Sequence, residues 1–157
     1  MKNIIYSLLS FSILLSFSSC NDDVAFEHLH TVDVEGWDYR KPVEFTFNAP
    51  DTSNKYNLIF DVRITPNYAY QNLWLFVETT EPDGYTHIDS INCPMAYPDG
   101  KWIGSGLGDL IDNPILIHRS FKFVKEGAYT LKIKHGMRHD FLPNIQNVGV
   151  ILKQINS

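Results

Sequence analysis

Apolar and polar residues alternate along several short stretches of this chain, and a period of two predicts β-strands. The alternation is clearest at Val43–Phe47 and Tyr129–Lys134, where one face of each strand is apolar and the other is polar. No stretch of ten residues has the spacing of an amphipathic helix, so the chain is predicted to be all-β. About eight strands are expected: Leu29–Val34, Val43–Phe47, Tyr56–Thr65, Leu73–Thr80, Thr86–Cys93, Ile115–Val124, Tyr129–Lys134 and Val148–Lys153.

Turn residues separate these stretches at regular intervals. Pro-Asp-Gly occurs at 82–84 and at 98–100, where proline fixes φ and glycine adopts positive φ easily. About eight strands with regular turns, in a segment of about 130 residues, are typical of a β-sandwich. We predict a single antiparallel two-sheet β-sandwich, jelly-roll-like, over residues 28–157, with an eight-stranded barrel as the alternative.

Two of the strands are apolar at successive positions instead of alternate ones. These are Leu58-Ile59-Phe60 and Leu73–Val77. Such strands are covered on both faces or carry an exposed binding surface. We therefore expect both of them near the centre of a sheet.

The first 19 residues have the layout of a secretory signal peptide, with Lys2 as a positive start and a mostly apolar stretch over 4–17. The stretch is shorter than the roughly 20 apolar residues that a transmembrane helix needs. It ends in Phe-Ser-Ser-Cys, which resembles the lipobox of bacterial lipoproteins, whose cysteine is lipidated and becomes the new N-terminus. We expect Cys20 to carry acyl chains such as palmitate and residues 20–27 to form a tether. A plain secretory signal is the alternative.

The residues after Cys20 bear on the location of the protein. Asn21-Asp22-Asp23 resembles the surface-export signal of lipoproteins in the Bacteroidetes, although a solvated tether has the same composition. We expect a lipid anchor in the outer membrane, with the domain facing either the periplasm or the cell surface. The contact with the membrane is then an anchor and not a span.

Composition and charge narrow the range of partners. The 157 residues are 44% hydrophobic and carry a formal net charge of −5, which fits one globular domain. An acidic chain has no overall attraction for phosphates, so we expect no nucleic-acid partner. With Cys20 lipidated, Cys93 has no disulfide partner and is expected to be a small buried hydrophobe.

No constellation in the sequence specifies a reaction, so we expect no enzymatic activity, no cofactor and no metal. Gly104–Gly108 is glycine-rich but is not followed by the helix that a phosphate-binding loop requires. Two alternatives stay open, a hydrolase with paired carboxylates and a calcium site at Asp109, Asp112 and Asn113. Two histidine pairs lack a third zinc ligand at a diagnostic distance: His28 with His30, and His135 with His139.

Aromatic side chains gather near the ends of the predicted strands. Exposed rings in such places stack on sugars or anchor protein partners in β-sandwich proteins. For the tryptophans, the favoured interpretation is that Trp37, Trp74 and Trp102 fill the core. The candidate binding positions are Tyr68, Tyr70, Trp74, Tyr97 and Trp102.

Several stretches after the signal segment are distinctive in sequence. The most specific are Asn-Leu-Trp-Leu-Phe at 72–76 and Gly-Lys-Trp-Ile-Gly-Ser-Gly at 100–106. Others are Cys20 in its lipobox, Tyr-Asn-Leu at 56–58, Val-Arg at 62–63, Gly-Met-Arg at 136–138 and Asn-Val-Gly at 147–149. Together and in this order they resemble the GldH family of gliding-motility lipoproteins from the Bacteroidetes.

The resemblance implies a small envelope lipoprotein with no known enzymatic activity. It implies partners among other envelope lipoproteins, motility components and the associated type IX secretion system, although members also occur in bacteria that do not glide. It supplies no catalytic residues. Arg63 and Arg138 lie in the matching stretches and join the candidate binding positions. Arg63 is expected either to be a cation on the surface of its strand or to pair with a carboxylate in a partly buried site. The alternative function is a lipid-anchored carbohydrate-binding module.

Overall fold

The computed structural model describes residues 23–106 and 108–155, and every helix or strand found in them is a β-strand. The predicted signal peptide and the predicted lipidation site at Cys20 lie outside the described residues. The strands are β1 (Val24–Thr31), β2 (Trp37–Asp38), β3 (Val43–Asn48), β4 (Lys55–Ile64), β5 (Asn72–Thr80), β6 (Thr86–Pro94), β7 (Ile111–Phe121), β8 (Ala128–His135), β9 (Phe141–Leu142) and β10 (Ile145–Ile155).

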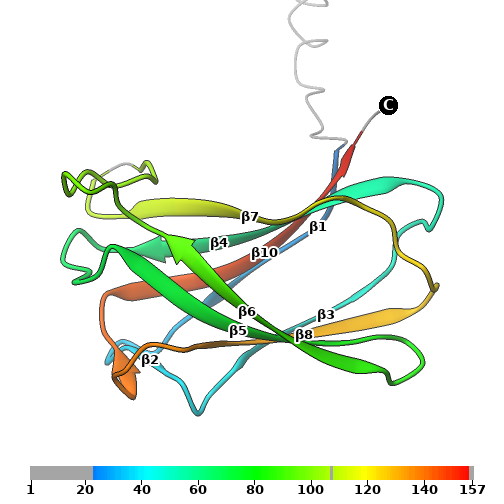
Figure 1. The fold of residues 1–157 in the computed structure, drawn as a ribbon, viewed down its shortest axis with the longest axis horizontal. Coiled ribbons are helices and arrows are strands. Elements are labelled where there is room, and N and C mark those ends of the chain that lie inside the picture. The colour runs from blue at the N-terminus through cyan, green and yellow to red at the C-terminus, as the bar shows by residue number, and fades with distance from the viewer. Residues whose placement is uncertain (1–22, 107, 156–157) are drawn as a thin grey trace, which may run out of the picture.

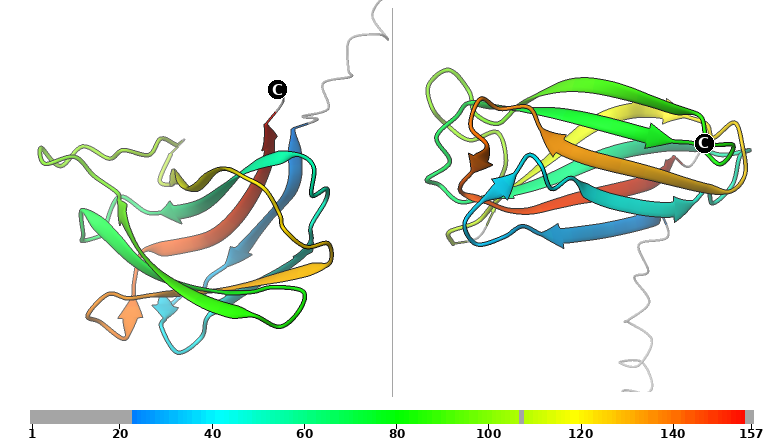
Figure 2. Two further views of the ribbon diagram at one scale, coloured as in Figure 1. Left: turned by 45° about the vertical axis from the view of Figure 1, so that its right-hand side comes forward. Right: turned by 90° about the horizontal axis from the view of Figure 1, so that it is seen from below.

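The eight long strands form two four-stranded antiparallel sheets (Figure 1). One sheet has the order β1-β10-β4-β7 and the other the order β3-β8-β5-β6, and Figure 2 shows them as two layers. With the short strands β2 and β9 set aside, this is the strand order of a jelly roll. The predicted two-sheet sandwich is therefore confirmed. β2 and β9 pair only with each other, with Trp37 opposite Leu142.

All eight expected strands are present, but some of their ends differ from the prediction. β1 begins at Val24 and not at Leu29, so residues 24–27 pair with β10 instead of belonging to a tether. This correction has a packing reason, because the Phe26 ring lies 5.0 Å from the ring of Phe47 on β3. β2 and β9 escape prediction because two residues are too few to show a period.

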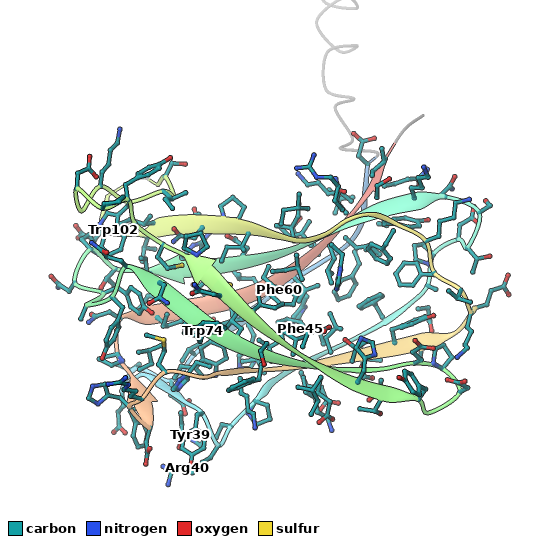
Figure 3. The ribbon with its side chains drawn as sticks, in the orientation of Figure 1. Tyr39, Arg40, Phe45, Phe60, Trp74 and Trp102 are labelled. Carbon is teal, nitrogen blue, oxygen red and sulfur yellow. The ribbon has the colours of Figure 1, made fainter. Side chains whose placement is uncertain are left out.

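The inner faces of the two sheets form one hydrophobic core. β3 alternates buried and exposed residues, as its sequence predicts. Figure 3 shows Phe45 of β3 and Phe60 of β4 between the sheets, where both are buried. β4 and β5 each have a neighbouring strand on both sides, which confirms the central positions expected from their successive apolar residues.

The two ends of the sandwich carry connections of different length. Where β1 begins and β10 stops, which we call the near end, the connections are 49–54, 81–85 and 122–127. The opposite end, the far end, carries the connections 32–42, 65–71, 95–110 and 136–144, which include β2 and β9. All five aromatic candidates lie in the far-end connections or, for Trp74, close to them at the start of β5.

Candidate functional site

A groove on the outer face of the β3-β8-β5-β6 sheet brings together residues from separate parts of the chain. It has a volume of about 630 Å³ and lies where β5 begins. Its lining residues are Tyr70, Asn72, Trp74, Phe76, Gly136, Met137, Arg138 and His139. Three of the predicted positions, Tyr70, Trp74 and Arg138, therefore share one site.

Alternation along β5 decides which of its side chains reach the groove. Leu73 and Leu75 are fully buried in the core, so Trp74 and Phe76 project from the opposite face of the sheet. Trp74 keeps 41% of its surface exposed (Figure 3). Together with Met137, these rings form an apolar patch with polar neighbours, the kind of surface that marks an interaction site.

The wall opposite β5 depends on Gly136, which directly follows β8. Its backbone N–H donates to the Trp74 carbonyl oxygen at 2.7 Å and holds the chain alongside β5. The Trp74 backbone N–H in turn donates to the sulfur of Met137 at 3.4 Å. A Cβ atom on Gly136 would lie 2.6 Å from the Phe76 ring, so the backbone approaches this ring closely only because residue 136 is glycine.

A row of aromatic rings joins the groove to the core. The Tyr70 ring centroid lies 6.3 Å from that of His139 and 5.6 Å from that of Tyr68. The Tyr68 ring centroid in turn lies 6.4 Å from that of Trp102. Tyr68 is buried, and its hydroxyl donates to the Asn72 carbonyl oxygen at 3.0 Å. Burial raises the pKa of Tyr68, which keeps this hydroxyl protonated as a donor. Tyr68 and the partly buried Trp102 thus support the groove from beneath it.

The other predicted positions lie outside the groove. Tyr97 is half exposed in the 95–110 connection. Arg63 lies on the outer face of the other sheet, where its guanidinium pairs with the Asp112 carboxylate on β7, as expected for a carboxylate partner. Of the three tryptophans, Trp37 is the one that is buried in the core.

Five lining residues are not among the sequence-based candidates: Asn72, Phe76, Gly136, Met137 and His139. A signal for Phe76 exists, because it lies two residues after Trp74 and so on the same face of the strand. Met137 lies in the distinctive Gly-Met-Arg stretch at 136–138, but nothing in the sequence places residues 137 and 139 beside β5. Their position depends on the pairing of β5 with β8, which alternation within each strand does not reveal.

Comparison with known proteins connects this geometry to a family. A family model described as "GldH lipoprotein" matches residues 24–152, which span β1 to β10. The chain belongs to the GldH lipoprotein family. The resemblance noted from the sequence is thereby confirmed.

Two curated GldH relatives align along most of the chain. A "Gliding motility lipoprotein GldH" from Flavobacterium johnsoniae is 30% identical over 154 residues, which cover 94% of each chain. A "Gliding motility lipoprotein GldH homolog" from Christiangramia forsetii is 30% identical over 128 residues, covering 82% of this chain and 77% of the relative. The names of both relatives describe motility lipoproteins and mention no reaction.

Among solved structures, the family GH115 4-O-methyl-alpha-glucuronidase BtGH115A overlaps this GldH chain with a TM-score of 0.42 and 12% identity. The overlap covers 88% of this chain and 18% of that one, and at this TM-score no function follows from it. Residues 23–106 and 108–155 include no helix that is long and apolar enough to cross a membrane.

The reactive side chains of this GldH domain are dispersed. The described residues contain no group of three or more His, Cys, Asp or Glu that is suited to a metal ion. Cys93 is buried, as predicted, and burial raises the pKa of its thiol to about 12, which keeps it in the unreactive protonated form. Asp112 pairs with Arg63, whereas the Asn113 side chain is buried and donates to the Val62 carbonyl oxygen at 3.1 Å.

Asp61 is a partly buried carboxylate on the outer face of the β1-β10-β4-β7 sheet. It lies on β4 between Gly149 of β10 and Pro114 of β7. Its Oδ1 atom is buried and has no hydrogen-bond donor among the described residues, because Arg63 pairs with Asp112 instead. Burial raises the pKa of Asp61, and the negative charge of Asp112 raises it further, against a smaller lowering by Arg63.

Replacing Asp61 by asparagine is expected to raise the free energy of unfolding at pH 7 by about 1 kcal/mol, because it removes an unsatisfied, desolvated charge. A carboxyl whose pKa is raised on folding loses its contribution to stability as pH rises through the folded pKa. The advantage of Asp61→Asn should therefore shrink as the pH falls towards about 4. Urea unfolding at both pH values measures this, and a variant less stable than the wild type at pH 7 contradicts it.

Proposed function

We propose that this protein is a non-enzymatic, lipid-anchored component of the cell envelope that serves the gliding-motility machinery and the associated type IX secretion system. It acts there as a scaffold or accessory protein that binds other envelope lipoproteins or machinery components. Membership of the GldH lipoprotein family and the names of the two relatives support this role. The lipobox at Cys20 supports attachment to the outer membrane through acyl chains.

The groove beside β5 is the observation that carries the binding role. Tyr70, Trp74, Met137 and Arg138 all belong to residue types that are enriched at protein interfaces. Trp74 combines a large exposed ring with a backbone whose N–H and carbonyl groups are both hydrogen-bonded to residues 136 and 137. A rigid aromatic side chain of this kind loses little conformational entropy on binding and is a typical hot spot.

Trp74→Ala is expected to reduce recovery of envelope partners at least about tenfold in a crosslinking pull-down from intact cells with a tagged copy. The reason is that truncation removes the exposed ring at the centre of the groove lining. Tyr97→Ala is the matched control, because Tyr97 is half exposed at the same end of the domain but does not line the groove. Mass spectrometry of the captured proteins gives the readout, and equal recovery with both variants contradicts the proposal.

A carbohydrate ligand is the second candidate for the same groove. The exposed Trp74 ring has the hydrogen-bonding side chains of Asn72, Arg138 and His139 around it, and a ring with polar neighbours suits stacking on a sugar. A glycan array probed with the wild type and with Trp74→Ala tests this function. Binding that disappears in the variant supports it, whereas a wild-type signal at background level excludes it.

A further inference from the structure

The start of β1 limits how far the domain extends from the membrane. Val24 pairs with Lys153 at the near end, and only three residues separate Val24 from Cys20. An extended chain spans at most about 3.6 Å per residue, so Cys20 lies within roughly 14 Å of Val24. A lipid attached to Cys20 therefore leaves little room between the near end and the bilayer.

We infer that the near end of the sandwich is a membrane-contacting surface that lies against the lipid headgroups and the outer part of the acyl chains. The partner is thus the lipid surface into which Cys20 is anchored. This inference rests on the lipid anchor of the proposed function and adds an orientation to it, because it has the near end of the domain facing the bilayer.

Apolar groups at the near end suit this contact. Val124, in the 122–127 connection, is 86% exposed. Beside it a hollow of about 240 Å³ opens between the sheets, with Phe121 and Phe123 among its lining residues. Apolar surface that a soluble domain would leave in water is buried when this end meets acyl chains.

The charge of the near end suits the same contact. Together with the adjoining ends of the strands, the near end comprises segments 23–25, 49–56, 81–86, 119–127 and 153–155. These segments carry as many cationic as anionic side chains. The cationic ones are Lys55, Arg119, Lys122, Lys125 and Lys153, and the anionic ones are Asp23, Asp51, Glu81, Asp83 and Glu126. The net charge of −5 therefore resides in the remainder of the chain. The near end is therefore less strongly repelled by an anionic lipid surface than the remainder of the chain taken together.

The orientation places the groove away from the membrane. Strand β5 begins at the far end, and the groove lies at that start. A strand of eight residues such as β1 is about 25 Å long, which is the separation between the two ends. Partners that bind in the groove would therefore do so beyond the membrane surface and not within the lipid layer.

A fluorophore at either end tests the inference in the lipidated full chain. Val124→Cys and the matched control Val34→Cys, an equally apolar and fully exposed residue at the far end, are labelled with an environment-sensitive dye. Cys93 is buried and does not compete for the label, and Cys20 is blocked by its lipid. The labelled proteins are incorporated into phosphatidylethanolamine–phosphatidylglycerol vesicles that contain a headgroup nitroxide quencher.

We expect at least about twofold stronger quenching, together with a blue shift, for the label at 124 compared with the label at 34. Flotation with the vesicles, with a Cys20→Ser variant for comparison, tests the anchor separately. Equal quenching at both positions in a protein that floats overturns the orientation and leaves the anchor intact. A wild type that fails to float overturns the anchor, and the inference with it.

Discussion

Replacing Phe60 by alanine is expected to lower the free energy of unfolding by about 3–5 kcal/mol. Phe60 is fully buried on β4, where its neighbours across the sheet are Val150 of β10 and Ile115 of β7. The variant loses the transfer free energy of the ring and leaves a cavity between two sheets that cannot close over it. Total stability of such domains is about 5–15 kcal/mol, so a large share would be lost.

Urea unfolding followed by circular dichroism measures this effect. The control is Ile88→Ala, because Ile88 is 64% exposed and its substitution should change stability by less than about 0.5 kcal/mol. A loss below about 1 kcal/mol for Phe60→Ala would show that the two sheets do not pack around this ring as described.

The second large effect is a loss of stability in mild acid, caused by His135. The imidazole is buried beside Trp37, and its Nε2 donates to the Trp37 carbonyl oxygen at 2.9 Å. Within the part of the chain that the structure describes, Nδ1 has no hydrogen-bond partner. Burial lowers the pKa of His135. The nearby backbone carbonyl groups and Asp38 raise this pKa, but by a smaller amount.

The sign of the pH effect follows from this lowered pKa. Below about pH 6.5 the unfolded chain binds a proton at residue 135, whereas the folded chain does not. The free energy of unfolding therefore falls as the pH falls. We expect His135 to contribute a slope of up to about 1.4 kcal/mol per pH unit, present below pH 6.5 and absent above it. Asp61, whose pKa is raised, acts in the opposite direction at lower pH.

The contribution of His135 is the difference in the pH dependence of the unfolding free energy between the wild type and a variant without this imidazole. His135→Gln keeps an amide N–H donor but does not titrate, so its unfolding free energy should lack this slope. His139→Gln is the control, because His139 is exposed and its removal should leave the slope in place. Urea titrations at several pH values between 5 and 8 measure the slopes, and identical slopes for the wild type and His135→Gln contradict the prediction.

Alternation within strands made most of the fold predictable. β3 and β8 show it directly, and successive apolar residues correctly placed β4 and β5 inside their sheets. The start of β1 was not predictable, because Val24 and Phe26 owe their place to contacts with β10 and β3 that are distant in sequence. The β2–β9 pair was missed for the same reason, since each strand is defined only by its partner.

The candidate site was predictable to a smaller extent. Aromatic residues near loop ends pointed to Tyr70 and Trp74, which the groove brings together with Arg138. The same reasoning could not separate them from Tyr68, because whether a ring faces water or the core depends on strand register and on the chain packed over it. Gly136 belongs to the distinctive Gly-Met-Arg stretch, but its role becomes visible only from its contact with the Phe76 ring.

The pairing of the first strand with the last has a consequence for how the protein is made. Thr31 of β1 receives a hydrogen bond from Asn147 of β10, a residue 116 positions later. β10 is also the strand that joins β1 to β4, so the sheet stays incomplete until almost the whole chain has been synthesised. Long-range pairings of this kind fold slowly. Export across a membrane, which the lipid anchor proposed above requires, would gain from this delay, because an unfolded chain can be threaded through the membrane before its domain closes.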